Sequence, residues 1–480
     1  MASKRGLLKL NKQKERCELS YSEGTKVRIE GGNEPMKKKM GLLSCVLMAI
    51  FITLLLIGFT HAAPKAPKEI RVGTVACITG MYAGMADGGV FGLQAAIEDL
   101  NQQGGAFVKE FGRKIPIKLT VVNSESDPQK AGTLAESLIL QDNVQFLICH
   151  NEPPPMHASV ATMAARHKIP HLANVAVMEP WLGMREGASP PWDYTWALGF
   201  AIATPAAPGS IWDKPGYTVA DTWKEELNQY GDKTDKKIGI FASDDPDGVG
   251  WYMLFSKMLK DWGYDVIGID KKIGLFPMDT TDFSSIIQVW KNNNVEILWG
   301  NCPAPLFGAL WRQAHTLGFQ PKIVSAGRAA LYYTDISAWG GDLPNGIGTE
   351  TFWSPAVKTY VAIGNTTPKS LYERWLKQKK RPFNVAMGLG YQVVQVLANA
   401  IERAGALNAD AVLRALGDTD MKTIVDRVKF DQKTHFARIP VFFGQWQKTH
   451  KPEVWECPIV FSRHDFLPAT AKFLFPIPSK

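Results

Sequence analysis

The sequence predicts an α/β protein made of two doubly wound lobes, each a parallel sheet covered by helices. Short and almost wholly apolar segments, typical of strands buried on both faces of a parallel sheet, alternate strictly with segments of helical spacing. This alternation runs through residues 70–175, stops, and restarts near residue 222 on the same plan. Two such halves in one chain predict a cleft between them.

The first half contains three strand–helix pairs and a fourth strand. Residues 70–78 form a near-continuous apolar run that ends in Thr79-Gly80 and a glycine-rich turn, and helical spacing follows from Val90 to Leu100. We predict the later strands at 115–122, 146–149 and 169–175, and the later helices at 129–141 and 158–167.

The second half repeats this pattern after residues 178–214, a stretch rich in Pro, Gly and Trp that we predict to be irregular. Ligands of open α/β sheets bind outside the carboxyl ends of the strands, so the turns after these strands are the candidates for a binding site. We expect strands at 237–242, 265–269, 295–299 and 322–325, and helices at 222–229, 250–262, 283–292 and 305–317.

The composition is that of a globular protein, with 45% hydrophobic residues among 480. The net charge of +8 is concentrated near the start of the chain. Residues 1–62 hold 11 Lys and Arg and 5 Asp and Glu, which leaves 43 and 41 for the remainder. A nearly neutral remainder gives no electrostatic reason to expect nucleic acid or anionic lipid as a partner.

Residues 36–62 have the layout of a secretory signal peptide: three lysines, an apolar stretch, and small residues before Pro64. We predict cleavage after Ala62 and a protein that works in the periplasm or elsewhere outside the cytoplasm. The alternative is an uncleaved anchor, since the stretch is long enough to span a bilayer. Residues 1–35 are polar and without apolar periodicity, so we interpret them as a non-native extension.

The sequence lacks the common signatures of catalysis, cofactors and metals. It has no GxGxxG, no GxxxxGK[ST] and no Gly-x-Ser-x-Gly turn. Histidines crowd residues 150–171 without HExxH or zinc-like spacing, so we predict no cofactor and no metal site. Cys77 and Cys149 end strands that are expected to be neighbours. They could form a disulfide, or these and the later cysteines, Cys302 and Cys457, could be free thiols.

Several short motifs carry a resemblance to a known family. They are IRVG (70–73), GLQAAIEDLNQQGG (92–105), KIGI (237–240) with DDPDG (244–248), LWRQA (310–314), AIERAG (400–405) and FFGQW (442–446). Their order and spacing are similar to those of type I periplasmic solute-binding proteins, and more closely to the branched-chain amino-acid-binding branch that serves ABC transporters. The resemblance covers residues 68–450.

This resemblance implies that the chain crosses between two lobes three times, near residues 200–206, 352–357 and 437–441. Lobe one would comprise residues 63–202 and 356–437, and lobe two residues 203–355 and 438–480. The resemblance also implies a monomeric receptor that closes on a small-molecule ligand by hinge motion and delivers it to the membrane permease of an ABC importer. Such a protein is not an enzyme.

The chain departs from the family where amino-acid-binding members hold the ligand's ammonium with two acidic side chains. The first position falls within residues 201–209, which contain no acid, and the second is Arg328. A guanidinium is permanently cationic and offers a fork suited to a carboxylate. The turn at 151–155, which replaces a serine-rich turn, contains three prolines and therefore lacks backbone donors for a carboxylate.

These differences predict a small carboxylate ligand without a free α-amino group, such as an aromatic acid. Arg328 would meet this ligand or an internal acid, either Glu152 or Glu350. A ring could stack on aromatic residues near strand ends, namely Tyr82, Trp181, Trp251 and Trp299. Alternatively, Arg328 pairs across the cleft and the tryptophans are core. The predicted ligand-binding residues are Tyr82, Asn151, Glu152, Val175, Val177, Asp247, Trp251, Asn301 and Arg328.

Two further functions are compatible with the sequence. A sensing module of the same fold would signal to a partner without transport, and neighbouring genes for a kinase or regulator, rather than a permease and an ATPase, would favour it. A secreted α/β enzyme would need a nucleophile or metal site that the sequence does not display.

Overall fold

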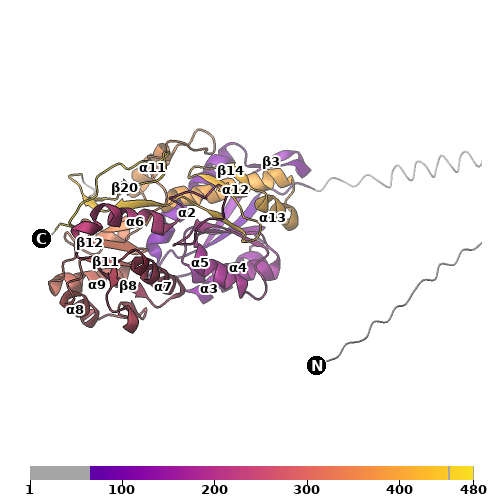
Figure 1. Cartoon of the computed structure of the whole chain (residues 1–480). Coiled ribbons are helices and arrows are strands. Elements are labelled where there is room, and N and C mark those ends of the chain that lie inside the picture. Colours follow the sequence, from indigo (N-terminus) through magenta and orange to yellow (C-terminus); the bar gives the residue numbers. More distant parts are fainter. Residues whose placement is uncertain (1–64, 452–453, 479–480) are drawn as a thin grey trace, which may run out of the picture. The chain divides into compact units, whose positions relative to one another are not determined.

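The computed structural model describes residues 65–451 and 454–478, which form two α/β lobes (Figure 1). The predicted extension (1–35) and signal peptide (36–62) lie outside the described residues. Among the helices of the described part, none combines the length and apolar character that a membrane span requires.

Lobe one is built on a six-stranded sheet with the order β16-β7-β6-β5-β1-β4, in which every pairing is parallel. Because β1 lies between β4 and β5, the direction of strand order reverses at the β1–β5 edge, where doubly wound sheets bind ligands. The strands are β1 (Ile70–Ala76), β4 (Ile117–Asn123), β5 (Phe146–Ile148), β6 (His171–Val177), β7 (Thr195–Phe200) and β16 (Phe436–Arg438).

Helices cover both faces of this sheet. Ile70 and Val72 of β1 pack in a cluster with α2 and α12, whereas Val75 packs with α3 and α4 on the opposite face. This two-sided burial explains the unbroken apolar run in the sequence. The helices of the lobe are α2 (Ala83–Gln102), α3 (Pro128–Leu140), α4 (Pro154–His167), α5 (Met178–Glu186), α11 (Pro368–Lys379), α12 (Ala386–Ala404) and α13 (Ala409–Gly417).

Lobe two repeats the plan and adds antiparallel strands. Its main path is β10-β8-β11-β12-β13-β17-β20, with β9 paired to β8, and only the β13–β17 and β17–β20 pairings are antiparallel among those described. The order again reverses at a central edge, here β8–β11. The strands are β8 (Lys237–Ser243), β9 (Asp265–Val266), β10 (Leu275–Phe276), β11 (Ile297–Asn301), β12 (Ile323–Gly327), β13 (Gly348–Thr351), β17 (Phe442–Gln445) and β20 (Ile459–Phe461).

The remaining elements lie outside the two main sheets. The helices of lobe two are α6 (Val219–Tyr230), α7 (Pro246–Asp261), α8 (Ser284–Asn292), α9 (Ala304–Thr316) and α10 (Tyr333–Ser337). Three two-stranded ribbons pair β2 (Ala106–Val108) with β3 (Arg113–Ile115), β14 (Asp420–Lys422) with β15 (Arg427–Lys429), and β18 (Gln447–Lys448) with β19 (Trp455–Glu456).

The chain passes between the two main sheets three times: from β7 to β8, from β13 to β16 and from β16 to β17. The predicted fold class, two doubly wound lobes with a three-crossing hinge, is confirmed. The exact residue boundaries of the lobes stay a prediction.

Two sequence predictions are wrong. The stretch 178–214 is not wholly irregular, because it contains α5 and β7. The buried position of β7 between β6 and β16, rather than an apolar period, makes it a strand. The glycine-rich turn after β1 is mostly helix, since α2 begins at Ala83 and includes Gly84, Gly88 and Gly89.

The contact between α2 and α12, which lie side by side in Figure 1, depends on glycine. A Cβ atom on Gly92 would lie 2.1 Å from the carbonyl oxygen of Met387, and one on Gly390 would lie 2.2 Å from that of Gly89. Two helix backbones approach this closely only where no side chain intervenes.

We therefore expect Gly92→Ala to lower the free energy of unfolding by about 1–3 kcal/mol, because the two backbones must separate. Gly183→Ala in α5 is the matched control, since nothing lies within 4 Å of its added Cβ. Better helix propensity should leave this control unchanged or stabilise it by up to about 1 kcal/mol. Urea unfolding measures both variants, and equal destabilisation would contradict the close-contact argument.

Candidate functional site

A small cavity of about 30 Å³ lies between the two lobes, beside the carboxyl ends of strands from both sheets. Seven of the nine predicted ligand-binding residues line it: Asn151, Glu152, Val175, Val177, Asp247, Asn301 and Arg328. The first four come from lobe one and the other three from lobe two. The turns that follow parallel strands lie at one edge of each sheet. The predicted ends of the strands were therefore sufficient to predict these lining residues.

Arg328 follows β12 and lies 4% exposed at the cavity. Its Nη1 donates to Asp245 Oδ2 at 2.7 Å, and its Nη2 donates to Asp245 Oδ1 at 3.1 Å and to Ser243 Oγ at 2.7 Å. Its Nε lies 3.5 Å from Asp247 Oδ2 and has no hydrogen-bond partner. Glu350 instead accepts the Arg328 backbone N–H at 3.0 Å.

The internal acid of Arg328 was therefore predicted wrongly. Neither Glu152 nor Glu350 pairs with the guanidinium; Asp245 does, bidentately and from the same lobe, with Asp247 beside it. The sequence signal that could have identified this pair is the acidic run 244–247 directly after β8, at the edge that β8 shares with β11 and β12.

The acids around Arg328 differ in their protonation. Burial opposes the charged form of Asp245, but the Arg328 charge and the hydrogen bonds to the carboxylate outweigh it and lower its pKa. Burial raises the pKa of Asp247 to about 6 although Arg328 opposes the shift, and burial raises that of Glu350 to about 7. Near neutral pH, Asp245 is thus ionised and is the counter-ion of Arg328, whereas Glu350 is partly protonated.

Two residues that line the cavity hold a left-handed backbone conformation. Val175 has φ 57° and Arg328 has φ 59°. A β-branched residue at positive φ is a rare and strained arrangement that is found mainly at ligand sites. At Val175 it coincides with a register shift in β6, so the strand is bent where it meets the cavity.

The turn at 151–155 links the lobes but offers few backbone donors. Asn151 Nδ2 donates to the hydroxyl of Tyr332 in lobe two. Pro154 and Pro155 form the first turn of α4, and the next free amide, that of Met156, donates to Pro153. The start of α4 therefore presents no free amide to a carboxylate.

The aromatic residues that the sequence offered for stacking lie mainly elsewhere. Trp251 and Trp299 are buried in an aromatic cluster of lobe two around Trp223, and Trp181 is buried in lobe one. Trp251 is buried in the core and does not line the cavity, so its contact with a ligand stays a prediction. Tyr82 does not line the cavity either, although it is half-buried and burial raises its pKa to about 12.

The sequence did not predict a pair of stacked phenylalanine rings at the cavity, which we call the aromatic wall. Phe200 and Phe352, at the first two crossings of the hinge, stack with ring centroids 4.6 Å apart and line the cavity. Met85 and Leu331 also line it. Only the resemblance pointed to the crossings, and no local pattern marked these two rings.

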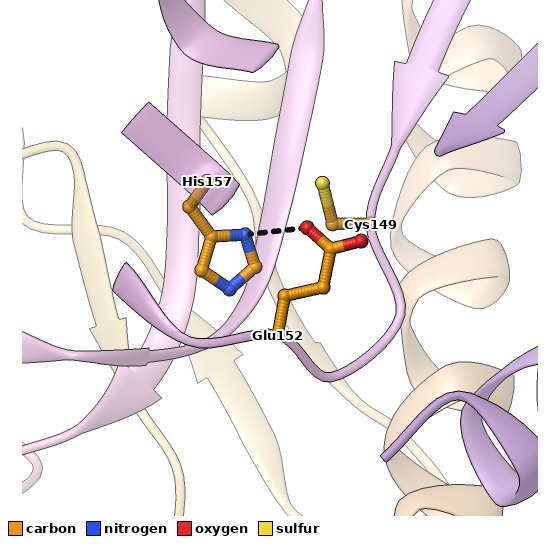
Figure 2. Close-up of side chains that lie close together, drawn as sticks. All are labelled: Cys149, Glu152 and His157. Atoms are coloured by element: carbon orange, nitrogen blue, oxygen red, sulfur yellow. Dashed lines mark ion pairs between the residues drawn. The ribbon is translucent and has the colours of Figure 1, made fainter. Parts of the chain in front are cut away.

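Two cysteines and three histidines of lobe one are fully buried, namely Cys77, Cys149, His150, His157 and His171. The possible Cys77–Cys149 disulfide does not form: these two and Cys302 are buried free thiols, and Cys457 is a half-buried one. Although the sequence predicted no metal site, Cys149, Glu152 and His157 place one ligand atom each within 4.8 Å of the others (Figure 2). Burial lowers the pKa of His157 to about 4, so its ring is neutral at neutral pH.

Known proteins resemble the chain over most of its length. A family profile described as a periplasmic binding protein matches residues 69–451. The Leu/Ile/Val-binding protein BraC3 of Rhizobium johnstonii is 24% identical over 82% of this chain and 96% of its own. A leucine-, isoleucine-, valine-, threonine- and alanine-binding protein of Pseudomonas aeruginosa is 22% identical over 84% and 96%.

Solved structures share the fold. The leucine-binding protein LivK of Thermotoga maritima has a TM-score of 0.62 at 18% identity, covering 79% of this chain and 95% of that one. A solute-binding protein of Rhodopseudomonas palustris BisB5, in complex with 3,4-dihydroxybenzoic acid, has a TM-score of 0.60 at 17% identity, covering 84% and 99%. Another from R. palustris, in complex with 4-hydroxybenzoate, has a TM-score of 0.59 at 16% identity, covering 82% and 97%.

Proposed function

Because the chain belongs to the periplasmic binding protein family, in its branched-chain amino-acid-binding branch, we propose that it receives a small organic carboxylate, aromatic in character, for an ABC importer. The resemblance found in the sequence is thereby confirmed. Members of this family are extracytoplasmic substrate-binding proteins of ABC transporters. The proposal concerns the ligand, which we take to be an aromatic acid rather than a branched-chain amino acid, and the delivery of that ligand to a permease.

The observation that carries this proposal is a buried guanidinium beside an aromatic wall. The unpartnered Nε of Arg328 and the side chains of Asn151 and Asn301 are polar groups at the cavity that can face a carboxylate. The stacked rings of Phe200 and Phe352 supply an apolar surface for a ligand ring. A few polar groups in an otherwise apolar pocket are typical of small-molecule sites.

The same groups are poorly suited to an α-amino acid. An ammonium needs a fixed negative charge, but Asp245 is already paired with Arg328, Asp247 lies 3.5 Å from the same guanidinium, and the raised pKa of Glu350 reduces its charge near neutral pH. Two solved relatives of the same fold hold hydroxybenzoates, which favours the aromatic alternative.

The test is a thermal-shift screen followed by calorimetry with 4-hydroxybenzoate, 3,4-dihydroxybenzoate and leucine. A ligand that binds only the folded protein raises its melting temperature, so a saturable rise with an aromatic acid and none with leucine is expected. The affinity for the acid should fall as pH rises through about 7, because deprotonated Glu350 adds negative charge beside the anion. Tight leucine binding, with no heat from either aromatic acid, would refute the proposal.

Phe200→Leu tests the aromatic wall in the same assay. Loss of the stacked ring should weaken binding of the aromatic acid up to about tenfold, since aromatic pairs contribute about 0.5–1.5 kcal/mol beyond their buried area. Phe276→Leu, a buried ring in β10 that does not line the cavity, is the control and should bind as the unmodified protein does. Equal affinity of the two variants would remove Phe200 from the site.

A further inference from the structure

The turn between β5 and α4 brings together three side chains of the kinds that bind transition metals. Cys149 directly follows β5, Glu152 lies in the turn, and His157 lies in the first turn of α4. All three are buried, and one ligand atom from each lies within 4.8 Å of the others. Figure 2 shows the imidazole and the thiol on either side of the Glu152 carboxylate.

This group is poorly satisfied by the protein alone. Both carboxylate oxygens of Glu152 and both ring nitrogens of His157 are buried without a hydrogen-bond partner. Around the carboxylate, the nearest basic nitrogens are His150 Nε2 at 3.0 Å and His157 Nδ1 at 3.8 Å. A buried carboxylate whose nearest basic groups are two imidazoles, one of them beyond hydrogen-bond distance, is poorly compensated, so a further component is expected to complete the group.

From this geometry we propose that Cys149, Glu152 and His157 bind one divalent cation of the zinc class. Burial raises the pKa of the Cys149 thiol, so binding of the cation releases the thiol proton to solvent. The resulting thiolate, the Glu152 carboxylate and a neutral imidazole together carry two negative charges, which a divalent cation balances. Sulfur, nitrogen and oxygen ligands suit Zn²⁺, which takes four ligands in a tetrahedron and can keep one position open. The site does not depend on the identity of the solute in the cleft.

Neighbouring side chains are placed to orient the three ligands. His171 Nε2 lies 3.1 Å from Cys149 Sγ, and its Nδ1 lies 3.2 Å from Thr195 Oγ1. If Nδ1 accepts the threonine proton, Nε2 donates to the sulfur and stabilises the thiolate. His150 holds the other end of the carboxylate at 3.0 Å. Such outer contacts fix ligand orientation in known metal sites.

The site adjoins the cleft at one residue. Glu152 also lines the inter-lobe cavity, and Asn151, between two of the ligands, contacts Tyr332 of lobe two. A bound cation would therefore fix the turn that makes this contact between the lobes.

The experiment titrates the purified protein, freed of metal by a chelator and kept without solute, with Zn²⁺ by calorimetry and with Co²⁺ by absorption. One ion per chain is expected, together with a thiolate-to-Co²⁺ charge-transfer band and a raised melting temperature. Cys149→Ser should abolish the band, and both Cys149→Ser and His157→Gln should weaken Zn²⁺ binding by more than about tenfold.

Cys302→Ser is the matched control, because Cys302 is also a buried thiol directly after a central strand, in lobe two. This variant should keep the stoichiometry and the band. If the site variants fail to fold, the band of the unmodified protein still decides. Absence of Zn²⁺ binding, bound Co²⁺ without a thiolate band, or undiminished binding by Cys149→Ser would overturn the proposal. A negative solute screen has no bearing on it, because the titration contains no solute.

Discussion

Arg328→Gln is expected to lower the free energy of unfolding by about 3–5 kcal/mol, because it removes the cation from a buried ion pair and leaves its partner charged. Arg328 is 4% exposed and holds Asp245 through two parallel hydrogen bonds, with Asp247 beside it. Without Arg328, burial raises the pKa of Asp245, so protonation of its carboxyl relieves part of the loss but leaves the buried group without its partner. Urea unfolding at neutral pH measures the difference.

The matched control is Arg427→Gln. Arg427 makes the same two-point contact with Asp420, at 2.6 and 2.8 Å, but on the surface, with 47% of its side chain exposed. Exposed pairs of this kind contribute about 0–1 kcal/mol, so this variant should differ little from the unmodified protein.

A double-mutant cycle locates the cause of the Arg328 effect. Asp245→Asn in the Arg328→Gln background should recover part of the lost stability, because one buried charge fewer is then left unpaired. Additive losses, or equal losses in the Arg328 and Arg427 variants, would mean that the buried pair is not what stabilises this part of lobe two.

Glu226→Gln is expected to remove a strong pH dependence of stability. The side chain of Glu226 in α6 is fully buried, accepts hydrogen bonds from Ser325 Oγ at 2.7 and 2.9 Å, and burial raises its pKa to about 8. The folded state therefore binds this proton more tightly than the unfolded chain, whose carboxyl has a pKa near about 4.3. The stabilisation is complete below that value and is lost as pH rises towards about 8, at up to about 1.4 kcal/mol per pH unit.

The measurement compares urea unfolding of the unmodified protein and the Glu226→Gln variant at pH 5 and pH 8. Other buried acids titrate in both proteins, so the difference between the two curves isolates Glu226. The variant should gain about 3 kcal/mol relative to the unmodified protein between these pH values. Curves that stay parallel would show that Glu226 is not buried as a neutral acid. Glu225→Gln, at a half-buried carboxylate of the same helix turn that pairs with Arg463, controls for a general effect of losing a carboxylate.

The sequence predicted where a site could form more successfully than it predicted the chemistry there. Asn151, Asp247, Asn301 and Arg328 all follow parallel strands, and the structure brings them to one cavity because such strands share an edge. The counter-ion of Arg328 was assigned wrongly, because the sequence shows which residues are acidic but not which carboxylate lies within hydrogen-bond distance of the guanidinium. The tryptophans were ambiguous for the same reason: apolar aromatic residues are equally suited to core and to ligand contact.

The amino-acid sequence by itself determined the alternation of strands and helices, because a strand that is buried on both faces of a parallel sheet is a local apolar segment. This alternation in turn predicted two lobes whose strand ends face a cleft. Only the tertiary structure decided which distant side chains meet. The Phe200–Phe352 wall, the Arg328–Asp245 pair, and the group of Cys149, Glu152 and His157 depend on loop conformation and on the packing of one element against another. These contacts leave no periodic pattern in the sequence.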